Sequence, residues 1–307
     1  MDDVAIVGRG IIGTSWALVF ARAGLGVSIW DRSGLSEAKI ISDLQASATS
    51  LIGTNCAVPP EAFDRIRVHR ELKNVLRGAR YVQESAPEDL ALKRELLHQI
   101  ADAADPGTIL ASSTSGLRPS ELADGIAARE RFLVVHPLTP PHLLPLTEVV
   151  PSPFTSDEVV EHTCAFMTDV GQAPVRLLRE TPGFVANRVL GAMLNEFFHL
   201  VREGVIRPQD VDTVITQGFG LRWACMGPFA AMDLNAPGGI ADYLSRYGGI
   251  FEKVAKERNA SSALDDALIK TLAESMRAEH SLEANPARAA LRDRAIAHVR
   301  QVRTVVP

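Results

Sequence analysis

The sequence contains 307 residues, of which 46% are hydrophobic and 22% are charged, and its formal net charge at pH 7 is −5. This composition is that of an ordinary globular protein with a full core, and the acidic balance excludes a basic nucleic-acid-binding surface. No apolar run is long enough to cross a bilayer, so we expect no membrane partner.

A Gly-x-Gly-x-x-Gly motif, at Gly8, Gly10 and Gly13, follows the first predicted strand at residues 4–7. Gly8 allows a sharp turn, Gly10 allows a pyrophosphate to approach the backbone, and Gly13 allows the next helix to pack closely on the sheet. Apolar residues at helical spacing predict that this helix ends near Gly24. Its N-terminus offers unpaired N–H groups to phosphates.

A second short apolar run, residues 27–30, predicts a strand that ends at Asp31. A carboxylate at this position would accept hydrogen bonds from the adenosine ribose hydroxyls and would repel a 2′-phosphate. We therefore expect NAD as the cofactor, although the cation of Arg32 could serve the 2′-phosphate of NADP.

Strands and helices alternate over the first half of the chain. Further strands are expected at residues 66–68, 79–84, 108–111, 132–136, 146–150 and 174–178, and helices at 33–51 (capped by Ser33 or Ser36), 87–104, near 120, and 157–170. This alternation predicts an α/β fold, a Rossmann-type, doubly wound and mainly parallel sheet.

No convincing strand follows residue 181. Helices are expected at 184–202, from Pro208, from Pro228, and at 286–302. We therefore expect an NAD-binding Rossmann domain at residues 1–181 and an all-helical C-terminal domain at residues 182–307. By analogy with other folds of this kind, the helical domain completes the active site and carries the interface of a homodimer.

Polar residues that could take part in catalysis or ligand binding lie where predicted strands end. A serine-rich loop, residues 111–116, follows one strand, and such loops lie where doubly wound proteins bind ligands. His136 ends the next strand and is followed by a proline-stiffened segment. Alone, the loop could be solvated and the histidine structural.

Glu148 favours a catalytic interpretation, because it interrupts an apolar strand and a buried carboxylate must be paired. A His136–Glu148 pair would orient the imidazole as the base for alcohol oxidation. Asn187, early in the first C-terminal helix, could donate to a substrate oxygen or could be an ordinary interface asparagine.

Together these segments resemble the L-3-hydroxyacyl-CoA dehydrogenase family, and within it the L-gulonate 3-dehydrogenase (lambda-crystallin) branch. The resemblance covers nearly the whole chain. The motifs that carry it are Gln83-Glu84-Ser85-Ala86-Pro87-Glu88-Asp89-Leu90 through Lys93, Ser113-Thr114-Ser115, His136-Pro137 with Pro140-Pro141, Pro145-Leu146-Thr147-Glu148-Val149, Gly183-Phe184 with Asn187-Arg188, and Gly220-Leu221-Arg222-Trp223-Ala224 with Gly227-Pro228.

The resemblance implies a role for each matching residue. His136 becomes the general base, Glu148 its orienting partner, and Ser115 and Asn187 the groups that hold the substrate oxygen. The positions implied to contact the cofactor, besides the glycines, are Ile11, Ile12, Asp31, Glu88 and Lys93. From the residues alone, Lys93 would be a solvated helix lysine and Glu88 an acid at a helix N-terminus.

Arg222 bears on the choice of substrate. The resembled branch has arginine in this segment and the acyl-CoA branch lacks it, and a free hydroxy acid offers a carboxylate that a guanidinium binds well. An interface arginine is the alternative. One departure concerns Thr139, where relatives usually have asparagine, so the substrate need not be gulonate itself.

We therefore expect an NAD-dependent dehydrogenase of a free L-3-hydroxy acid. The alternatives are an acyl-CoA dehydrogenase of the same family, an L-carnitine dehydrogenase with Trp223 in an aromatic cage, or a non-catalytic NAD-binding protein. The three cysteines are odd in number and lack metal-ligand spacing, so we expect no metal site and a reducing, cytoplasmic location. The absence of a leader before Val4 favours the same location.

Overall fold

In the computed structural model the chain forms two compact units. The structure describes residues 3–32, 36–51, 54, 56–257, 265–279 and 281–302. The first unit comprises residues 1–189 together with 292–298, and the second comprises residues 190–291 and 299–307. The first unit thus extends beyond residue 181 and includes part of the last helix.

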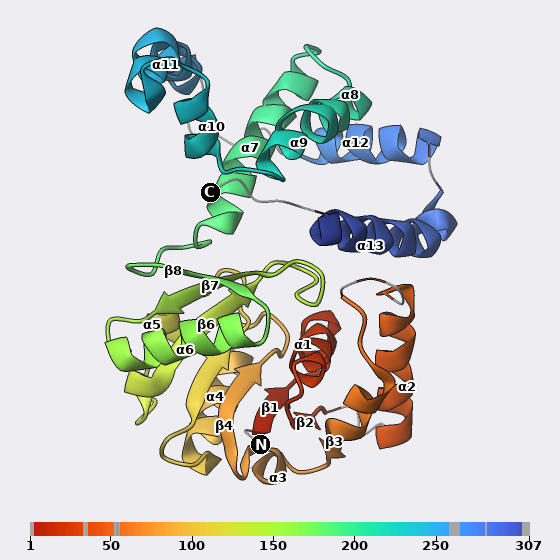
Figure 1. The fold of residues 1–307 in the computed structure, drawn as a ribbon, viewed down its shortest axis with the longest axis vertical. Coiled ribbons are helices and arrows are strands. Elements are labelled where there is room, and N and C mark those ends of the chain that lie inside the picture. Colours follow the sequence, from red (N-terminus) through yellow and green to blue (C-terminus); the bar gives the residue numbers. More distant parts are fainter. Residues whose placement is uncertain are drawn as a thin grey trace. The chain divides into compact units, whose positions relative to one another are not determined.

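The first unit is built on an eight-stranded sheet with the order β3-β2-β1-β4-β5-β6-β7-β8 (Figure 1). All neighbours are parallel except β6 and β7, so the expected Rossmann-type, mainly parallel sheet is confirmed. The strands are β1 (Asp3–Val7), β2 (Val27–Trp30), β3 (Ile66–His69), β4 (Ala79–Glu84), β5 (Ile109–Ser112), β6 (Phe132–Pro137), β7 (Leu146–Pro151) and β8 (Ala173–Arg176).

Helices cover both faces of this sheet, and each face has its own core (Figure 1). One core joins the sheet to α1 (Ile11–Arg22), α2 (Glu37–Ala48) and α6 (Asp157–Asp169). The other joins it to α3 (Leu72–Leu76), α4 (Leu90–Ala103) and α5 (Pro119–Leu122). The central strands β4, β6 and β7 are buried over most of their length, whereas the edge strands β3 and β8 are partly exposed. A polar residue within a buried strand needs a partner.

The second unit is helical. It contains most of α7 (Ala186–Arg202), all of α8 (Pro208–Val214), the π-helical turn η4 (Ile215–Phe219), α9 (Gly220–Trp223), α10 (Pro228–Leu234), α11 (Gly239–Glu257) and α12 (Asp266–Glu279), and parts of α13 (Asn285–Val302). Short 3₁₀ helices are η1 (Thr49–Leu51), η2 (Pro60–Arg65), η3 (Arg129–Arg131) and η5 (Leu282–Ala284). The helical C-terminal region is confirmed, and α11 and α12 are additions to the helices expected there.

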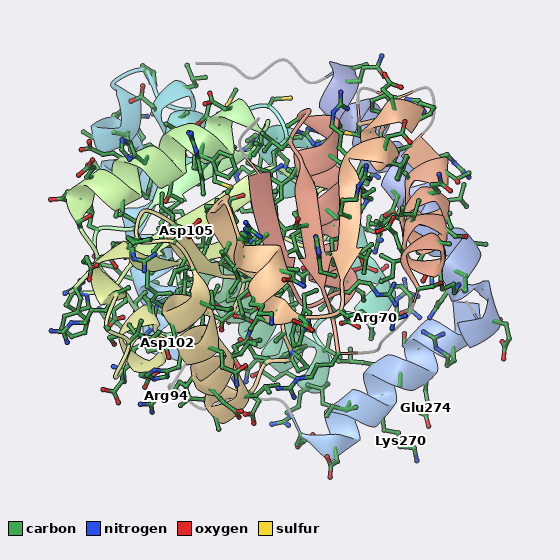
Figure 2. All side chains as sticks on the ribbon, turned by 90° about the horizontal axis from the view of Figure 1, so that it is seen from below. Arg70, Arg94, Asp102, Asp105, Lys270 and Glu274 are labelled. Atoms are coloured by element: carbon green, nitrogen blue, oxygen red, sulfur yellow. The ribbon has the colours of Figure 1, made fainter. Side chains whose placement is uncertain are left out.

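Charged residues mark the outer faces of the helices. Figure 2 shows Lys270 and Glu274 extending from α12, where they form an i,i+4 pair at 3.8 Å with both side chains mostly exposed. Arg94 and Asp102 extend from α4 in the same view. Within the described part of the chain, no helix has the length and apolar character needed to cross a membrane.

The expected helix at 33–51 is shorter in the structure. It begins after Ser36, whose hydroxyl accepts a hydrogen bond from the Lys39 amide at 3.3 Å. Ser33 lies outside the described residues. The last helix, α13, returns to the first unit, where Ala297 is fully buried against Leu51, Cys56 and Leu143.

Candidate active site

The glycine turn after β1 tolerates no side chain at two of its three glycines. Gly8 has φ +103°, and a Cβ atom there would lie 2.6 Å from the carbonyl oxygen of Ser85. A Cβ atom on Gly13 would lie 1.9 Å from the Gly8 carbonyl oxygen. Gly10 faces open space, as expected where a ligand approaches the backbone.

The same turn forms one wall of a cavity of about 430 Å³. No side chain caps the N-terminus of α1 at Gly10, and Gly10, Ile11 and Ile12 line the cavity, so the first N–H groups of the helix are available to a ligand there. Asp31, just beyond β2, accepts a hydrogen bond from the Arg9 amide at 3.2 Å and lines the cavity. These features fit a dinucleotide, with its pyrophosphate on the helix N-terminus and its adenosine ribose at Asp31.

His136 and Glu148 lie directly opposite each other on the antiparallel strands β6 and β7. The His136 Nδ1 and Glu148 Oε2 atoms are 2.8 Å apart, and the two residues are only 5% and 2% exposed. The other carboxylate oxygen, Oε1, accepts the backbone amides of Val185 and Ala186 at 2.8 and 3.0 Å. The predicted pairing therefore exists, and it also ties the start of α7 to β7.

The protonation state of this pair follows from its contacts. Burial favours a raised pKa for the Glu148 carboxyl, but the bonds from His136, Ala186 and Val185 together hold that pKa below its usual value of 4.5. An ionised carboxylate only accepts hydrogen bonds, so Nδ1 of a neutral His136 carries the proton. The lone pair is then on Nε2, which bonds to none of the described residues, so the imidazole can accept a proton there.

Phe184 is a neighbour of the imidazole that sequence reasoning did not assign. Its ring is fully buried with its centroid 5.4 Å from that of His136, and its φ of +51° is unusual for a bulky residue. Gly183-Phe184 is among the motifs that carry the family resemblance, and this was the signal in the sequence that could have identified Phe184. The backbone conformation positions the ring against His136 and allows the next two amides to meet Glu148.

Ser115 is held through its backbone. Its amide donates to Glu88 Oε1 at 2.9 Å, and its carbonyl accepts the Asn187 side-chain amide at 2.7 Å. The Thr114 hydroxyl also donates to Glu88 Oε1, at 2.6 Å. The Ser115 hydroxyl itself bonds to no other described residue and is free to meet a ligand.

A buried ion pair between Lys93 and Glu84 lies next to Glu88, which holds the Ser115 loop. Lys93 is 1% exposed, so the solvated position suggested by the residues alone is wrong. Its ammonium contacts the fully buried Glu84 at 2.9 and 3.1 Å, the Ala86 carbonyl at 3.0 Å and Glu88 at 3.6 Å. Ser112 donates to Glu84 at 2.5 Å. Sequence reasoning gave Glu84 no role, because the strand that it ends also contains Arg80 and Gln83 and so does not read as an apolar run with one acid.

The structure thus links most of the expected residues within the first unit. Contacts run from His136 through Glu148 to the start of α7, and from Asn187 on α7 to Ser115 and Glu88. Ile11 and Ile12 line the cavity at the glycine turn. Arg222 lies on α9 in the second unit, with an exposed side chain.

Family models match both halves of the chain. Residues 3–181 match the NAD-binding domain of 3-hydroxyacyl-CoA dehydrogenase, and residues 183–281 match the C-terminal domain of the same family. The NAD-binding match agrees with the geometry of the glycine turn and Asp31.

Curated relatives cover most of the chain. A lambda-crystallin homolog from Bos taurus is 41% identical over 262 residues, which are 82% of this chain and 80% of that protein. The lambda-crystallin of Oryctolagus cuniculus is 38% identical over 89% of this chain and 87% of its own. An L-carnitine dehydrogenase from Streptomyces coelicolor is 37% identical over 80% of this chain and 77% of its own.

Solved structures share the fold. A 5-formyl-3-hydroxy-2-methylpyridine 4-carboxylic acid 5-dehydrogenase, described as an NAD⁺-dependent dismutase, superposes with a TM-score of 0.85 at 28% identity over 98% of both chains. A 3-hydroxybutyryl-CoA dehydrogenase from Escherichia coli superposes with a TM-score of 0.67 at 28% identity, over 86% of this chain and 55% of that chain.

Proposed function

The chain belongs to the 3-hydroxyacyl-CoA dehydrogenase family and is an NAD-dependent oxidoreductase acting on CH–OH groups, and we propose that it oxidises the 3-hydroxyl of a free L-3-hydroxy acid of the L-gulonate type to the 3-oxo acid. The observation that carries this proposal is the buried His136–Glu148 pair, which leaves the Nε2 lone pair free at the sheet edge that also carries the glycine turn.

His136 is the general base in this proposal. Its Nε2 takes the proton of the substrate hydroxyl, and Glu148 stabilises the imidazolium that forms. The glycine turn and Asp31 would hold NAD, which would supply the acceptor for the hydride from the carbon that carries the hydroxyl. In the reverse direction the imidazolium returns its proton to the carbonyl oxygen.

Ser115 and Asn187 hold the reacting oxygen. The Ser115 hydroxyl is free, and the Asn187 amide that anchors Ser115 has a second N–H group to offer. Glu88 fixes the Ser115 amide, and Lys93 in turn lies beside Glu88. We propose that Glu88 and Lys93 contact the cofactor, and their bonds also position the Ser115 loop.

Arg222 is proposed to bind the substrate carboxylate. Its side chain is exposed and forms no ion pair among the described residues, so the guanidinium is available. A CoA thioester is disfavoured because the stretch at residues 37–63 offers only Lys39 as a cation for the CoA phosphates.

L-Carnitine is a second candidate, because it is itself a free 3-hydroxy acid with a quaternary amine. Phe219 and Trp223 stack with their centroids 5.1 Å apart, and both rings are exposed on the same helical run as Arg222. An aromatic face binds a quaternary ammonium by a cation–π interaction. This pair supports carnitine as a test substrate beside gulonate.

A substrate panel tests the proposal. L-Gulonate, 3-hydroxybutyrate, L-carnitine and 3-hydroxybutyryl-CoA are each assayed with NAD and with NADP, following absorbance of the reduced cofactor. We expect turnover of a free acid with NAD, loss of turnover in His136→Gln with cofactor binding retained, and a KM for the acid raised at least about tenfold in Arg222→Met. Turnover of the thioester alone, or of no substrate, would reject the proposal.

We also propose that the protein is a cytoplasmic homodimer. Apolar side chains are exposed on helices of the second unit, among them Leu190 and Leu194 on α7 and Ile250 and Phe251 on α11. Burial of these side chains by a second copy would remove a large apolar area from water. The odd number of cysteines, all free, supports a reducing compartment.

A further inference from the structure

Ser85 lies at the carboxyl end of β4, against the glycine turn. Its amide donates to the Val7 carbonyl at 2.7 Å, and its own carbonyl is the group that a Cβ atom on Gly8 would meet at 2.6 Å. Ser85 lines the same cavity as Gly8 and Gly10. Its side chain is therefore close to the position of a bound pyrophosphate.

The order of the strands decides which half of the dinucleotide Ser85 faces. β2, which leads to Asp31 and the adenosine ribose, lies on one side of β1, and β4 lies on the other (Figure 1). Beyond β4 come β5 and β6, which carry Ser115 and His136 at their carboxyl ends. Ser85 thus lies on the side where the nicotinamide nucleotide must extend toward the reacting residues.

A chain of buried hydrogen bonds reaches Ser85 from the interior of the sheet. The Tyr81 hydroxyl, whose pKa burial raises well above 10, remains a donor and bonds to Gln83 Oε1. This bond fixes the orientation of the Gln83 amide, and Nε2 donates to the Val135 carbonyl at 3.4 Å and to the Ser113 hydroxyl at 2.7 Å.

The direction of the last bond follows from the capacity of a hydroxyl, which has two acceptor lone pairs and one proton. Ser113 Oγ receives Gln83 Nε2 and also Trp16 Nε1 at 3.2 Å, and both of these are obligate donors. Its own proton must therefore go to Ser85 Oγ, 2.9 Å away. Ser85 is then the acceptor in that bond, and its proton is directed away from Ser113.

We infer that Ser85 is a cofactor-binding residue whose hydroxyl donates to an oxygen of the phosphate or ribose in the nicotinamide half of NAD. The relay from Tyr81 through Gln83 and Ser113 keeps the hydroxyl in the donating orientation. Because the phosphate and ribose oxygens are acceptors and the orientation is fixed before binding, the contact carries little entropic cost.

Cofactor fragments test this contact without turnover. Titration calorimetry compares the binding of AMP, ADP-ribose and NADH to the full-length protein and to Ser85→Ala. We expect ADP-ribose and NADH to bind about five- to tenfold more weakly to the variant, the loss of one hydrogen bond, and AMP to bind equally well. Unchanged affinity for ADP-ribose, or an equal loss for AMP, would overturn the inference.

Two further variants serve as controls. Ser28→Ala removes a hydroxyl that bonds to His69 between β2 and β3, and it should leave all three affinities unchanged. Ser113→Ala removes the acceptor of the Trp16 indole N–H and of one N–H of Gln83, so it should lower the melting temperature more than Ser85→Ala does. It should also weaken the binding of ADP-ribose about two- to threefold. Full ADP-ribose affinity in folded Ser113→Ala would contradict the relay.

Discussion

His136 illustrates how much depends on a single hydrogen bond at the residue scale. The imidazole is useful as a base only if its free lone pair is on Nε2, and the ionised Glu148 imposes that tautomer. The amides of Val185 and Ala186 occupy the other oxygen of Glu148, so the carboxylate cannot turn. The Glu148 carboxylate therefore both fixes the orientation of the His136 imidazole and supplies the negative charge beside it.

Glu148→Gln should remove the base without removing the fold. The two amides that donate to Oε1 would retain the glutamine carbonyl oxygen, so its NH₂ group would face Nδ1 and select the opposite tautomer. We expect kcat to fall between about 10²- and 10⁴-fold, with NADH affinity nearly unchanged. Steady-state kinetics and fluorescence titration measure the two quantities.

The control is Glu121→Gln, which alters an exposed carboxylate paired with Arg118 and should leave kcat unaltered. A kcat within about twofold of the parent enzyme in Glu148→Gln would show that Glu148 does not set the tautomer of His136. Such a loss is far smaller than the loss of rate expected when a general base is removed.

At the scale of elements, the sequence predicted the strands and the His136–Glu148 pair because those signals are local. An apolar run that contains one carboxylate indicates by itself that the strand is buried and that the carboxylate needs a partner. Lys93 shows the limit. Its position on α4 is an ordinary helix position, and its burial depends on the packing of α4 against the ends of β4 and β5, which no local pattern reveals.

Lys93→Met should therefore destabilise the first unit strongly. The substitution leaves the fully buried Glu84 without its counter-ion, and removing one partner of a buried pair typically costs about 3–5 kcal/mol. Lys73→Met removes a partner from the exposed Lys73–Glu71 pair and should cost less than about 1 kcal/mol. Urea unfolding compares the two.

The double variant Glu84→Gln with Lys93→Met distinguishes charge from packing. It removes both charges, so it should recover part of the stability lost by Lys93→Met alone. Equal urea midpoints for Lys93→Met and Lys73→Met would mean that the buried pair contributes no more than a surface pair.

For the whole molecule, the sequence indicated two regions but not the return of α13 to the first unit. The helix reads as an arginine-rich surface helix, and its contact through Ala297 joins residues that are more than 150 positions apart. Strand order beyond β1 and β2 was equally out of reach, because it depends on pairings between distant segments. The relay to Ser85 depends on that order and could only emerge from the structure.

The burial of His142 makes the stability of the first unit depend on pH. It is 7% exposed, its Nδ1 bonds to none of the described residues, and Arg22 donates to its carbonyl at 3.1 Å. Burial, and then the charge of Arg22, lower its pKa from 6.5 to about 4, against an opposing effect of Asp293 on α13.

The sign of the pH dependence follows from this lowered pKa. Between pH 4 and 6.5 the unfolded chain binds a proton at His142 that the folded chain does not, so stability is complete above pH 6.5 and is lost as the pH falls toward 4. The shift from 6.5 to about 4 corresponds to a loss of about 3 kcal/mol. The lowered pKa of Glu148 acts in a separate window, below 4.5.

His142→Gln should flatten the pH dependence of the urea midpoint between pH 4.5 and 6.5, because glutamine does not titrate. The exposed His162 on α6 provides the matched variant, and His162→Gln should retain the slope of the parent protein. Measurements at half-unit intervals separate the two variants even if His142→Gln lowers stability at every pH, since the slope and not the absolute midpoint carries the argument. If His142→Gln and the parent protein have the same slope across this range, the imidazole is protonated equally in the folded and unfolded chains, and the burial of His142 has no effect on acid stability.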